Sequence, residues 1–207
     1  MIKGLKICGV SDPKTLNYIL NHPHPPKFIG FITNYEKSRR FVPYEKLKHL
    51  INVDKKQVNF TSVLVKPTNE ILAKIKDLNF DYYQLYDVDP NRTMEIKYKY
   101  KIKIISALTI SSKEDVNKYK DYSEISDIIL FDSKGYHKSE SFDHSLLDGV
   151  PKELNKMIAG NIQIDDIPNF RNKDFIVDLS GALEDQNGKK DIDKIDNLLN
   201  TVHNINS

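Results

Sequence analysis

The chain has a single cysteine among its 207 residues, so no disulfide bond can form within it. Free thiols are typical of proteins that work in a reducing compartment. The first ten residues, MIKGLKICGV, pass directly into a strand-like run and lack the long apolar core of a signal peptide. We therefore expect a cytoplasmic protein.

Long apolar runs and an excess of one charge are also missing. No stretch approaches the roughly 20 apolar residues that a membrane-spanning helix requires, so we expect no membrane partner. The 31 Lys and Arg residues nearly cancel the 29 Asp and Glu residues, which leaves a formal net charge of +2. Because nucleic-acid-binding domains are usually much more basic, we expect no nucleic-acid partner. The lysine-rich segment 97–103 is most simply a solvated helix end running into a strand.

The composition is that of a globular domain with a substantial core. Hydrophobic residues make up 39% of the chain and charged residues 29%. No linker, low-complexity tract or compositional break divides the sequence, so we treat residues 1–207 as one domain. A length of about 200 residues is sufficient for a single-domain (β/α)8 barrel.

Short β-branched runs alternate with polar, helix-compatible stretches along the whole chain. Several runs are continuously apolar, as is typical of parallel strands covered on both faces. Crossovers of this length indicate parallel βαβ units, in a closed barrel or an open doubly wound sheet, because periodicity alone does not decide closure. The predicted strands are residues 5–10, 27–33, 58–65, 82–86, 101–110, 126–133, 155–160 and 175–180.

Helices are predicted between these strands, and two of them carry start signals. Ser112 precedes two acidic residues, and Thr68 offers a cap with an early acid after it. The links at 144–155 and 165–172 have room only for a short helix each. The clearly helical segments are residues 12–21, 43–51, 68–78, 89–99, 112–122 and 191–203.

Candidate catalytic groups lie at the ends of the first and sixth predicted strands, where a parallel barrel collects its functional residues. Cys8 ends the first strand, although an isolated cysteine beside apolar residues is often only a small core residue. Asp132 follows four large apolar residues, so its carboxylate is either buried with partners or emerges at the strand end. There it fits a general acid with a raised pKa, or the cap of the next loop.

Two later strand ends favour a phosphate site. Small residues let backbone N–H groups approach an anion, and barrels often bind phosphate after their seventh and eighth strands. Gly160 and Asn161 follow the seventh predicted strand, and Ser180 and Gly181 follow the eighth. Either loop alone is commonplace, whereas the pair in these strands is more specific.

The loop after the second predicted strand carries adjacent arginines, Arg39 and Arg40. An arginine can bind a carboxylate through two parallel hydrogen bonds. Taken alone, however, two arginines on a loop are ordinarily solvated charge.

In chain order, these segments resemble the phosphoribosylanthranilate isomerase family over nearly the whole sequence. No single motif is decisive, but their order and spacing together are specific. The motifs are KICGV (6–10), KSRRFV (37–42), YQLY (83–86), ILFDSK (129–134), SFDHSLL (141–147), IAGN (158–161), VDLSGALE (177–184) and GKKD (188–191).

The resemblance implies a (β/α)8 TIM barrel that acts in tryptophan biosynthesis without a cofactor or metal. The reaction would convert N-(5-phosphoribosyl)anthranilate to 1-(2-carboxyphenylamino)-1-deoxyribulose 5-phosphate by an Amadori rearrangement. Cys8 would be the general base, Asp132 the general acid and Arg40 the ligand of the anthranilate carboxylate. Gln84 falls in the fourth-strand substrate-binding motif, and Asp178 would bind a sugar hydroxyl or serve structure alone.

The sequence departs from the family pattern at the site. Tyr86 stands where the family usually has histidine, and the loop 135–141 replaces a glycine-rich one, which we expect to alter loop closure. Paired glycines after the seventh strand become Gly160-Asn161, and serine-serine-glycine after the eighth becomes Ser180-Gly181-Ala182. Backbone donors survive these changes if the loops keep their geometry, and asparagine tolerates a left-handed conformation better than most residues.

Three alternatives stay open at this stage. One is another barrel enzyme for a phosphorylated sugar, such as a histidine-pathway isomerase or an enzyme like indole-glycerol-phosphate synthase, which would place catalytic lysines at strand ends. Another is an isomerase with two substrates. The third is a barrel that has lost catalysis and binds a ligand or partner, against which Cys8, Arg40 and Asp132 together argue. Since relatives occur as monomers, dimers or fusions, we expect a monomer or homodimer.

Overall fold

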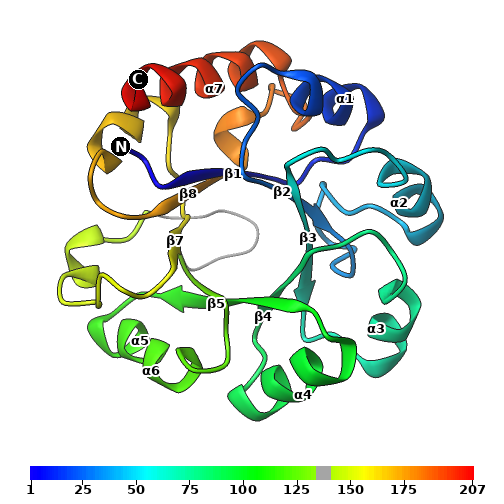
Figure 1. Cartoon of the computed structure of the whole chain (residues 1–207), viewed down its shortest axis with the longest axis vertical. Helices are drawn as coiled ribbons and strands as arrows, with labels where there is room; N and C mark the ends of the chain where they lie inside the picture. Colours follow the sequence, from blue (N-terminus) through cyan, green and yellow to red (C-terminus); the bar gives the residue numbers. More distant parts are fainter. Residues whose placement is uncertain (134–140) are drawn as a thin grey trace.

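In a computed structural model that describes residues 1–133 and 141–207, eight parallel strands close into a barrel. The strands pair in chain order, and β1 also pairs with β8, which closes the ring. Figure 1 looks into this ring, with the helices outside it. The (β/α)8 barrel is thereby confirmed and the open sheet is excluded. The strands are β1 (Gly4–Cys8), β2 (Phe28–Ile32), β3 (Asn59–Val65), β4 (Tyr82–Tyr86), β5 (Lys103–Ile110), β6 (Ile128–Ser133), β7 (Lys156–Ile158) and β8 (Ile176–Leu179).

The strands β1 and β7 each end two residues before the predicted run does, because the chain turns there. Gly9, with φ of 78°, ends β1 early, and Gly160, with φ of 105°, follows the short β7. Both backbone conformations favour glycine. The carboxyl ends of these two strands therefore lead immediately into tight turns.

The helices cover the outside of the barrel and begin where caps were predicted. Thr68 caps α3 through Ile71 N–H, and Ser112 forms a reciprocal capping box with Asp115. The fifth crossover is split into two short helices, and the last helix runs further than predicted. The helices are α1 (Pro13–Asn21), α2 (Tyr44–Leu50), α3 (Asn69–Ile75), α4 (Pro90–Tyr100), α5 (Lys113–Asn117), α6 (Tyr119–Tyr122) and α7 (Ile192–Asn206), with 3-10 turns η1 (His144–Leu147), η2 (Ile164–Phe170) and η3 (Gly181–Leu183).

Two apolar layers hold the barrel together. The larger lies between strands and helices, and a smaller one fills the barrel interior, as is usual for this architecture. The buried residues of this inner layer come from alternate positions of five strands, so the part of the interior that they fill is packed rather than open. They are Phe28, Ile105, Ala107, Ile128, Leu130, Met157, Ala159 and Ile176.

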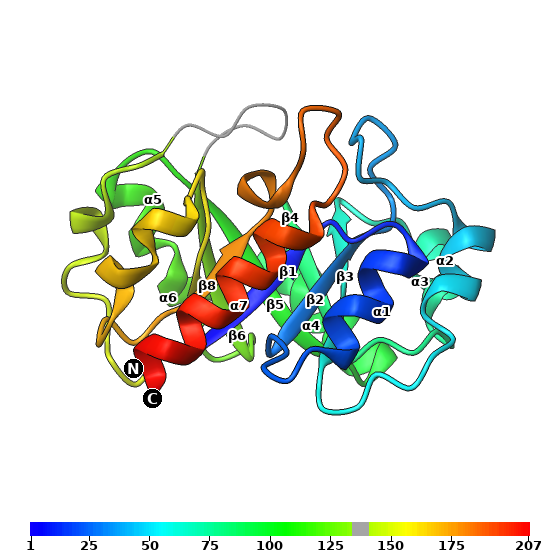
Figure 2. The same cartoon turned by 90° about the horizontal axis from the view of Figure 1, so that it is seen from above.

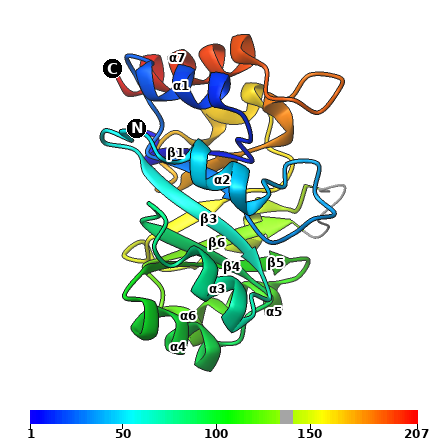
Figure 3. The ribbon, with the colours of Figure 1, turned by 90° about the vertical axis from the view of Figure 1, so that its right-hand side faces the viewer.

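The two faces of the barrel differ. The termini lie together at one face, where Ile2 N–H donates to Asn206 Oδ1 at 2.6 Å. The loop after β2 and the loop between η3 and α7 project from the opposite face, at the carboxyl ends of the strands (Figures 2 and 3). Within the described residues, no helix has the length and apolarity needed to cross a membrane.

Candidate active site

Strand alternation directs polar side chains into the mouth of the barrel. Successive residues of a strand face opposite sides, and Ile128 and Leu130 on β6 belong to the interior layer. Asp132, two residues further along, therefore faces the same interior at the carboxyl end. The same alternation brings Cys8, Gln84, Tyr86, Asp132 and Asp178 to one mouth.

Cys8 lies at the end of β1 against the backbone of β2, where its register partner is Gly30. A Cβ at position 30 would lie 2.8 Å from Cys8 Sγ and 3.2 Å from Lys6 Nζ. Glycine is therefore required there, because it leaves the space that both side chains occupy. The carbonyl of Cys8 accepts a hydrogen bond from Ser180 Oγ at 3.0 Å, which ties the ends of β1 and β8 together.

The thiol of Cys8 is buried, and burial raises its pKa above the ordinary value of 9.0. The ammonium of Lys6 opposes this rise, Asp178 adds to it, and Lys190 opposes it more weakly. The electropositive surroundings that a thiolate base needs are thus present in part. The effect of burial on the pKa of Cys8 is nevertheless larger than the opposing effect of these cations.

Lys6 and Asp178 form a buried ion pair inside the barrel. They are register partners across β1 and β8, so closing the barrel brings them together, with Nζ 2.5 Å from Oδ2. Burial raises the pKa of Asp178, and Lys6 counteracts that rise. The other carboxylate oxygen, Oδ1, is buried and has no partner among the described residues. It is available to a hydrogen-bond donor in the mouth.

Asp132 is held by two donors at the end of β6. The hydroxyl of Tyr86 donates to Oδ2 at 2.7 Å, and the backbone N–H of Ser133 donates to Oδ1 at 2.8 Å. Burial nevertheless raises the pKa of Asp132 to about 6, with a further contribution from the charge of Asp178. A carboxyl group with that pKa is protonated often enough near neutral pH to serve as an acid.

Tyr86 interacts with both candidate catalytic groups, Cys8 and Asp132. Burial raises the pKa of its phenol well above 10.0, and the charges of Asp132, Cys8 and Asp178 add to that rise. The phenol therefore stays neutral and donates to Asp132, while Gln84 Nε2 donates to the phenol oxygen at 3.1 Å. Cys8 and Asp132 therefore both lie close enough to Tyr86 to influence the same phenol.

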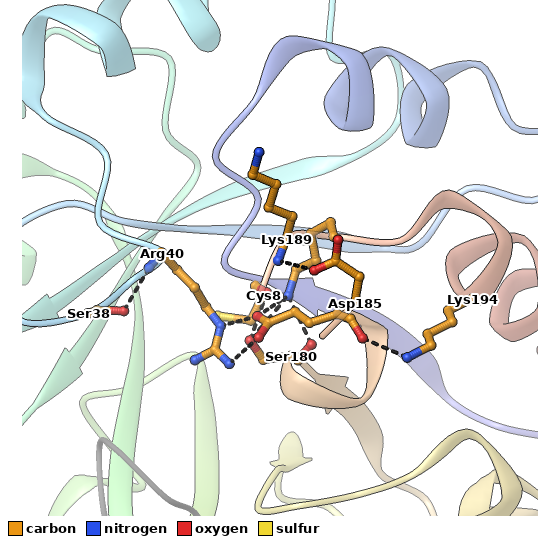
Figure 4. A network of polar contacts seen from close by, with 9 residues as sticks. Cys8, Ser38, Arg40, Ser180, Asp185, Lys189 and Lys194 are labelled. Atoms are coloured by element: carbon orange, nitrogen blue, oxygen red, sulfur yellow. Dashed lines mark hydrogen bonds and ion pairs between the residues drawn. The ribbon is translucent and has the colours of Figure 1, made fainter. Parts of the chain in front are cut away.

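Arg40 reaches across the mouth from the loop after β2 (Figure 4). A Cβ at position 9 would lie 2.4 Å from Arg40 Cδ, so Gly9 is what lets the arginine stem cross the end of β1. The guanidinium forms a two-pronged ion pair with Glu184, through Nε to Oε1 and through Nη2 to Oε2 at 3.0 Å. Glu184 thereby fixes the direction of the guanidinium.

Lys190 completes this network beneath Arg40. Its ammonium donates to the carbonyl of Ser180 at 2.9 Å and to Glu184 Oε1 at 3.1 Å. Burial would raise the pKa of Glu184, but Arg40 and Lys190 together hold it below the ordinary value. Glu184 is therefore a carboxylate, and the network carries a net positive charge next to the loop after β8.

The loops after β7 and β8 offer backbone donors at the same mouth. Asn161 adopts the left-handed conformation, with φ of 54°, as its residue type permits. A Cβ at position 160 would lie 2.7 Å from Ser133 Cβ, so Gly160 is needed for the close approach of β6 and β7. No described residue accepts a hydrogen bond from the backbone N–H groups of Gly160, Asn161, Gly181 or Ala182.

Sequence reasoning missed Lys6, Glu184 and Lys190. Each is a charged residue inside one of the motifs named above. For Lys6 the sequence holds a usable signal, because it lies two positions before Cys8 on one predicted strand and therefore on the same face. A lysine therefore lies beside the cysteine of the first strand. Lys134, which ends the sixth-strand motif, and most of the altered loop 135–141 lie outside the described residues. Within the described residues, no three His, Cys, Asp or Glu side chains are placed to hold a metal ion.

Comparisons with known proteins point to one family. The family model described as N-(5'-phosphoribosyl)anthranilate (PRA) isomerase matches residues 5–201. An N-(5'-phosphoribosyl)anthranilate isomerase of Parabacteroides distasonis is 31% identical, with 96% of this chain and 92% of the relative covered. One from Rhizobium johnstonii is 28% identical, with 100% and 97% covered.

Solved structures share the fold. Monomers generated from the dimeric phosphoribosylanthranilate isomerase of Thermotoga maritima have a TM-score of 0.83 and 22% identity, covering 99% of this chain and 100% of that one. A phosphoribosylanthranilate isomerase in complex with reduced 1-(o-carboxyphenylamino)-1-deoxyribulose 5-phosphate has a TM-score of 0.81 and 21% identity, with the same coverage. At this identity the likeness shows the fold alone.

Proposed function

This chain belongs to the N-(5'-phosphoribosyl)anthranilate isomerase family, and we propose that it isomerises that substrate with Cys8 as general base and Asp132 as general acid. The activity is a step of tryptophan biosynthesis. The observation that supports the assignment of roles is that Tyr86 donates a hydrogen bond to Asp132, whose pKa is about 6, and lies close enough to Cys8 for the two groups to interact. The chemistry needs one acid and one base, and no cofactor.

Asp132 opens the sugar ring. Its proton passes to the furanose oxygen as the C1–O bond breaks, and the nitrogen lone pair forms the C1=N bond of an iminium ion. The positive charge on this ion acidifies the C2–H bond. Burial keeps the Asp132 proton available at neutral pH, which suits the first step.

Cys8 then removes the proton from C2. The electrons of the C2–H bond form a C1=C2 bond, and those of C=N return to nitrogen, giving an enolamine. The thiol returns its proton to C1 while the C2 hydroxyl loses its proton to the Asp132 carboxylate. Both groups are restored, and the product is the aminoketose 1-(2-carboxyphenylamino)-1-deoxyribulose 5-phosphate.

The ends of the substrate are held by Arg40 and by the loops after β7 and β8. Glu184 occupies one edge of the guanidinium and leaves Nη1 for the anthranilate carboxylate. The N–H groups of Gly160, Asn161, Ser180 and Gly181 would donate to the phosphate. Asp178 Oδ1 and the Gln84 side chain would contact the sugar hydroxyls, since each has a buried oxygen without a partner among the described residues. Binding at both ends orients the reacting carbons.

The direct experiment is an assay of the purified protein on N-(5'-phosphoribosyl)anthranilate, followed by the loss of its fluorescence. Turnover would support the isomerase and exclude a barrel that only binds a ligand. Testing the corresponding histidine-pathway substrate in parallel would reveal an enzyme with two substrates. We further propose a cytoplasmic monomer or homodimer with no nucleic-acid or membrane partner, which gel filtration and fractionation of cells would test.

Replacing Arg40 with alanine is expected to raise KM for the substrate by about 10–100-fold, the loss of a charge-assisted pair to a carboxylate. Lys190 still pairs with Glu184 in this variant, so no buried carboxylate is left without a cation. The matched control is Arg39→Ala, which removes the exposed neighbouring arginine and should leave KM unchanged. Equal KM values for both variants and the wild-type enzyme would remove Arg40 from the site.

The pH dependence of kcat/KM is expected to show an acid limb near pH 6. The active enzyme carries one proton in total on Asp132 and Cys8. Below a pH of about 6 both groups are protonated, because the Asp132 carboxylate takes up a proton while the thiol keeps its own. Activity should therefore rise through pH 6 to a plateau and fall only where the thiol ionises, above its ordinary value of 9.0.

Tyr86→Phe provides the check on this limb. The hydrogen bond from the Tyr86 hydroxyl lowers the pKa of Asp132, so its removal should move the acid limb to higher pH. Rate profiles of the two proteins in the same buffers would measure the shift. A limb that stays in place, or moves to lower pH, would show that it belongs to another group.

A further inference from the structure

Lys6 is a completely buried cation that has no part in the mechanism proposed above. Its side chain has 0% exposure, in the interior of the barrel, where an ammonium is stable only with close partners. One partner is Asp178, at 2.5 Å. The neighbouring interior layer is built of apolar side chains, so Lys6 is an exception among the residues inside the barrel.

The second neighbour of Lys6 is the thiol of Cys8. Both side chains leave β1 on the same side, since they are two residues apart. Both end beside Gly30, with Sγ 2.8 Å and Nζ 3.2 Å from the point that a Cβ there would occupy. The missing side chain at Gly30 is therefore what brings ammonium and sulfur together in one buried space.

We propose that Lys6 is a positioning residue that stabilises the thiolate form of Cys8, and that Asp178 competes with the thiolate for the Lys6 ammonium. The inference rests on the proposed role of Cys8 as the base. An ammonium has three donors in rotatable directions, and a single carboxylate oxygen accepts from this one among the described residues. The remaining donors are free to face the sulfur.

The electrostatics of the three groups agree with this arrangement. Burial raises the pKa of Cys8, and Lys6 is the strongest of the groups that lower it, ahead of Lys190. Burial lowers the pKa of Lys6, whereas Asp178 and Cys8 raise it, and the net direction is upward. The Lys6 ammonium therefore stays charged beside both the Asp178 carboxyl group and the Cys8 sulfur.

Substrate binding would shift this balance toward the thiolate. Asp178 Oδ1 lacks a partner among the described residues and is buried at the mouth. A sugar hydroxyl that donates to Oδ1 withdraws negative charge from the carboxylate, so that Lys6 interacts more strongly with the sulfur. The base would then become active when the sugar is in place, and the enzyme without substrate would keep a protonated, less reactive thiol.

The test measures the pKa of Cys8 directly from the pH dependence of its alkylation by iodoacetamide. Because Cys8 is the chain's single cysteine, mass spectrometry of the intact protein reports this residue alone. The informative pair is Asp178→Asn and the double variant Lys6→Met/Asp178→Asn, since neither leaves a buried carboxylate without its cation. We expect Asp178→Asn to lower the pKa relative to wild type, and the double variant to raise it by roughly 1–3 units above Asp178→Asn.

Two further variants keep the test decisive. Lys6→Gln/Asp178→Asn keeps a neutral polar amide at both positions and replaces the methionine variant should that one not fold. Lys190→Met removes the other lysine near Cys8 and should raise the pKa less than loss of Lys6 does. Equal pKa values with and without Lys6 in the Asp178→Asn background, or a larger effect of Lys190, would overturn the proposal.

This experiment is independent of turnover. A Cys8 pKa that ignores Lys6 would remove the positioning role while leaving the isomerase and its base in place. Full activity of a Cys8→Ser variant would instead remove the base, whatever the alkylation shows. The two failures are therefore distinguishable.

Discussion

Replacing Asp132 with asparagine is expected to lower kcat by about 10²–10⁴-fold, the usual contribution of a general acid. The amide has nearly the same shape but carries no proton that can pass to the ring oxygen. It can still accept from the N–H of Ser133, so the fold and substrate binding should persist. Steady-state kinetics should therefore show a loss in kcat with little change in KM.

The matched control is Asp127→Asn, just before the start of the same strand. Asp127 pairs with Lys97 and accepts from the N–H of Ile104, at the opposite face of the barrel from the mouth. This variant should keep its kcat, even if it is less stable. Retention of near-wild-type turnover by Asp132→Asn would show that another group supplies the proton.

The Asp132→Asn substitution should also make the protein more stable at neutral pH. The folded pKa of Asp132, about 6, lies above its ordinary value of 3.8, so the folded state binds the proton more tightly. Its stabilising contribution is complete below pH 3.8 and is lost as the pH rises through 6. Asparagine avoids that loss. A pKa that rises from 3.8 to about 6 corresponds to roughly 3 kcal/mol above pH 6, so we expect a rise in Tm of roughly 6–12 °C at pH 7–8 and none near pH 3.5.

Replacing Cys8 with serine is expected to lower kcat by a similar factor, about 10²–10⁴-fold. A serine hydroxyl is a far weaker acid than a thiol, so its anion is not populated at neutral pH and it does not remove the C2 proton. The side chain is close in size to cysteine, so the contacts with Gly30 and Lys6 stay intact. Kinetics together with a thermal melt would separate loss of catalysis from loss of fold.

The double variant of Cys8 and Asp132 sharpens this result. Residues that act in one reaction sequence give strongly non-additive losses, so the double variant should be little slower than the slower single one. Multiplied losses would indicate independent roles. Unchanged turnover of the Cys8→Ser variant would end the assignment of the base.

Much of the fold was predictable because strand periodicity survives in single sequences. The sequence contains eight such runs, and their pattern places Cys8 and Asp132 at the ends of strands. What periodicity does not contain is closure. The pairing of β1 with β8 joins Lys6 to Asp178, 172 residues apart, and no local pattern reports such a contact.

The geometry around Arg40 was out of reach for the same reason. Its partner Glu184 is 144 residues away, and each residue alone resembles ordinary loop charge. The roles of Gly9 and Gly30 were not predictable either, because a glycine in or after a strand is commonplace. Only the structure shows that the side chains of other residues occupy the space beside these two glycines. The assignment of Arg40 to a carboxylate remains a prediction for the kinetic test above.

The most direct measurement is a crystal structure of this protein with reduced 1-(o-carboxyphenylamino)-1-deoxyribulose 5-phosphate, the compound found with a relative of the same fold. We expect its C1 and C2 atoms to lie between Cys8 Sγ and the Asp132 carboxylate. Its phosphate should lie on the loops after β7 and β8, with its carboxylate on Arg40. A bound analogue that leaves Cys8 and Asp132 on one side of those carbons, or outside contact with them, would contradict the account.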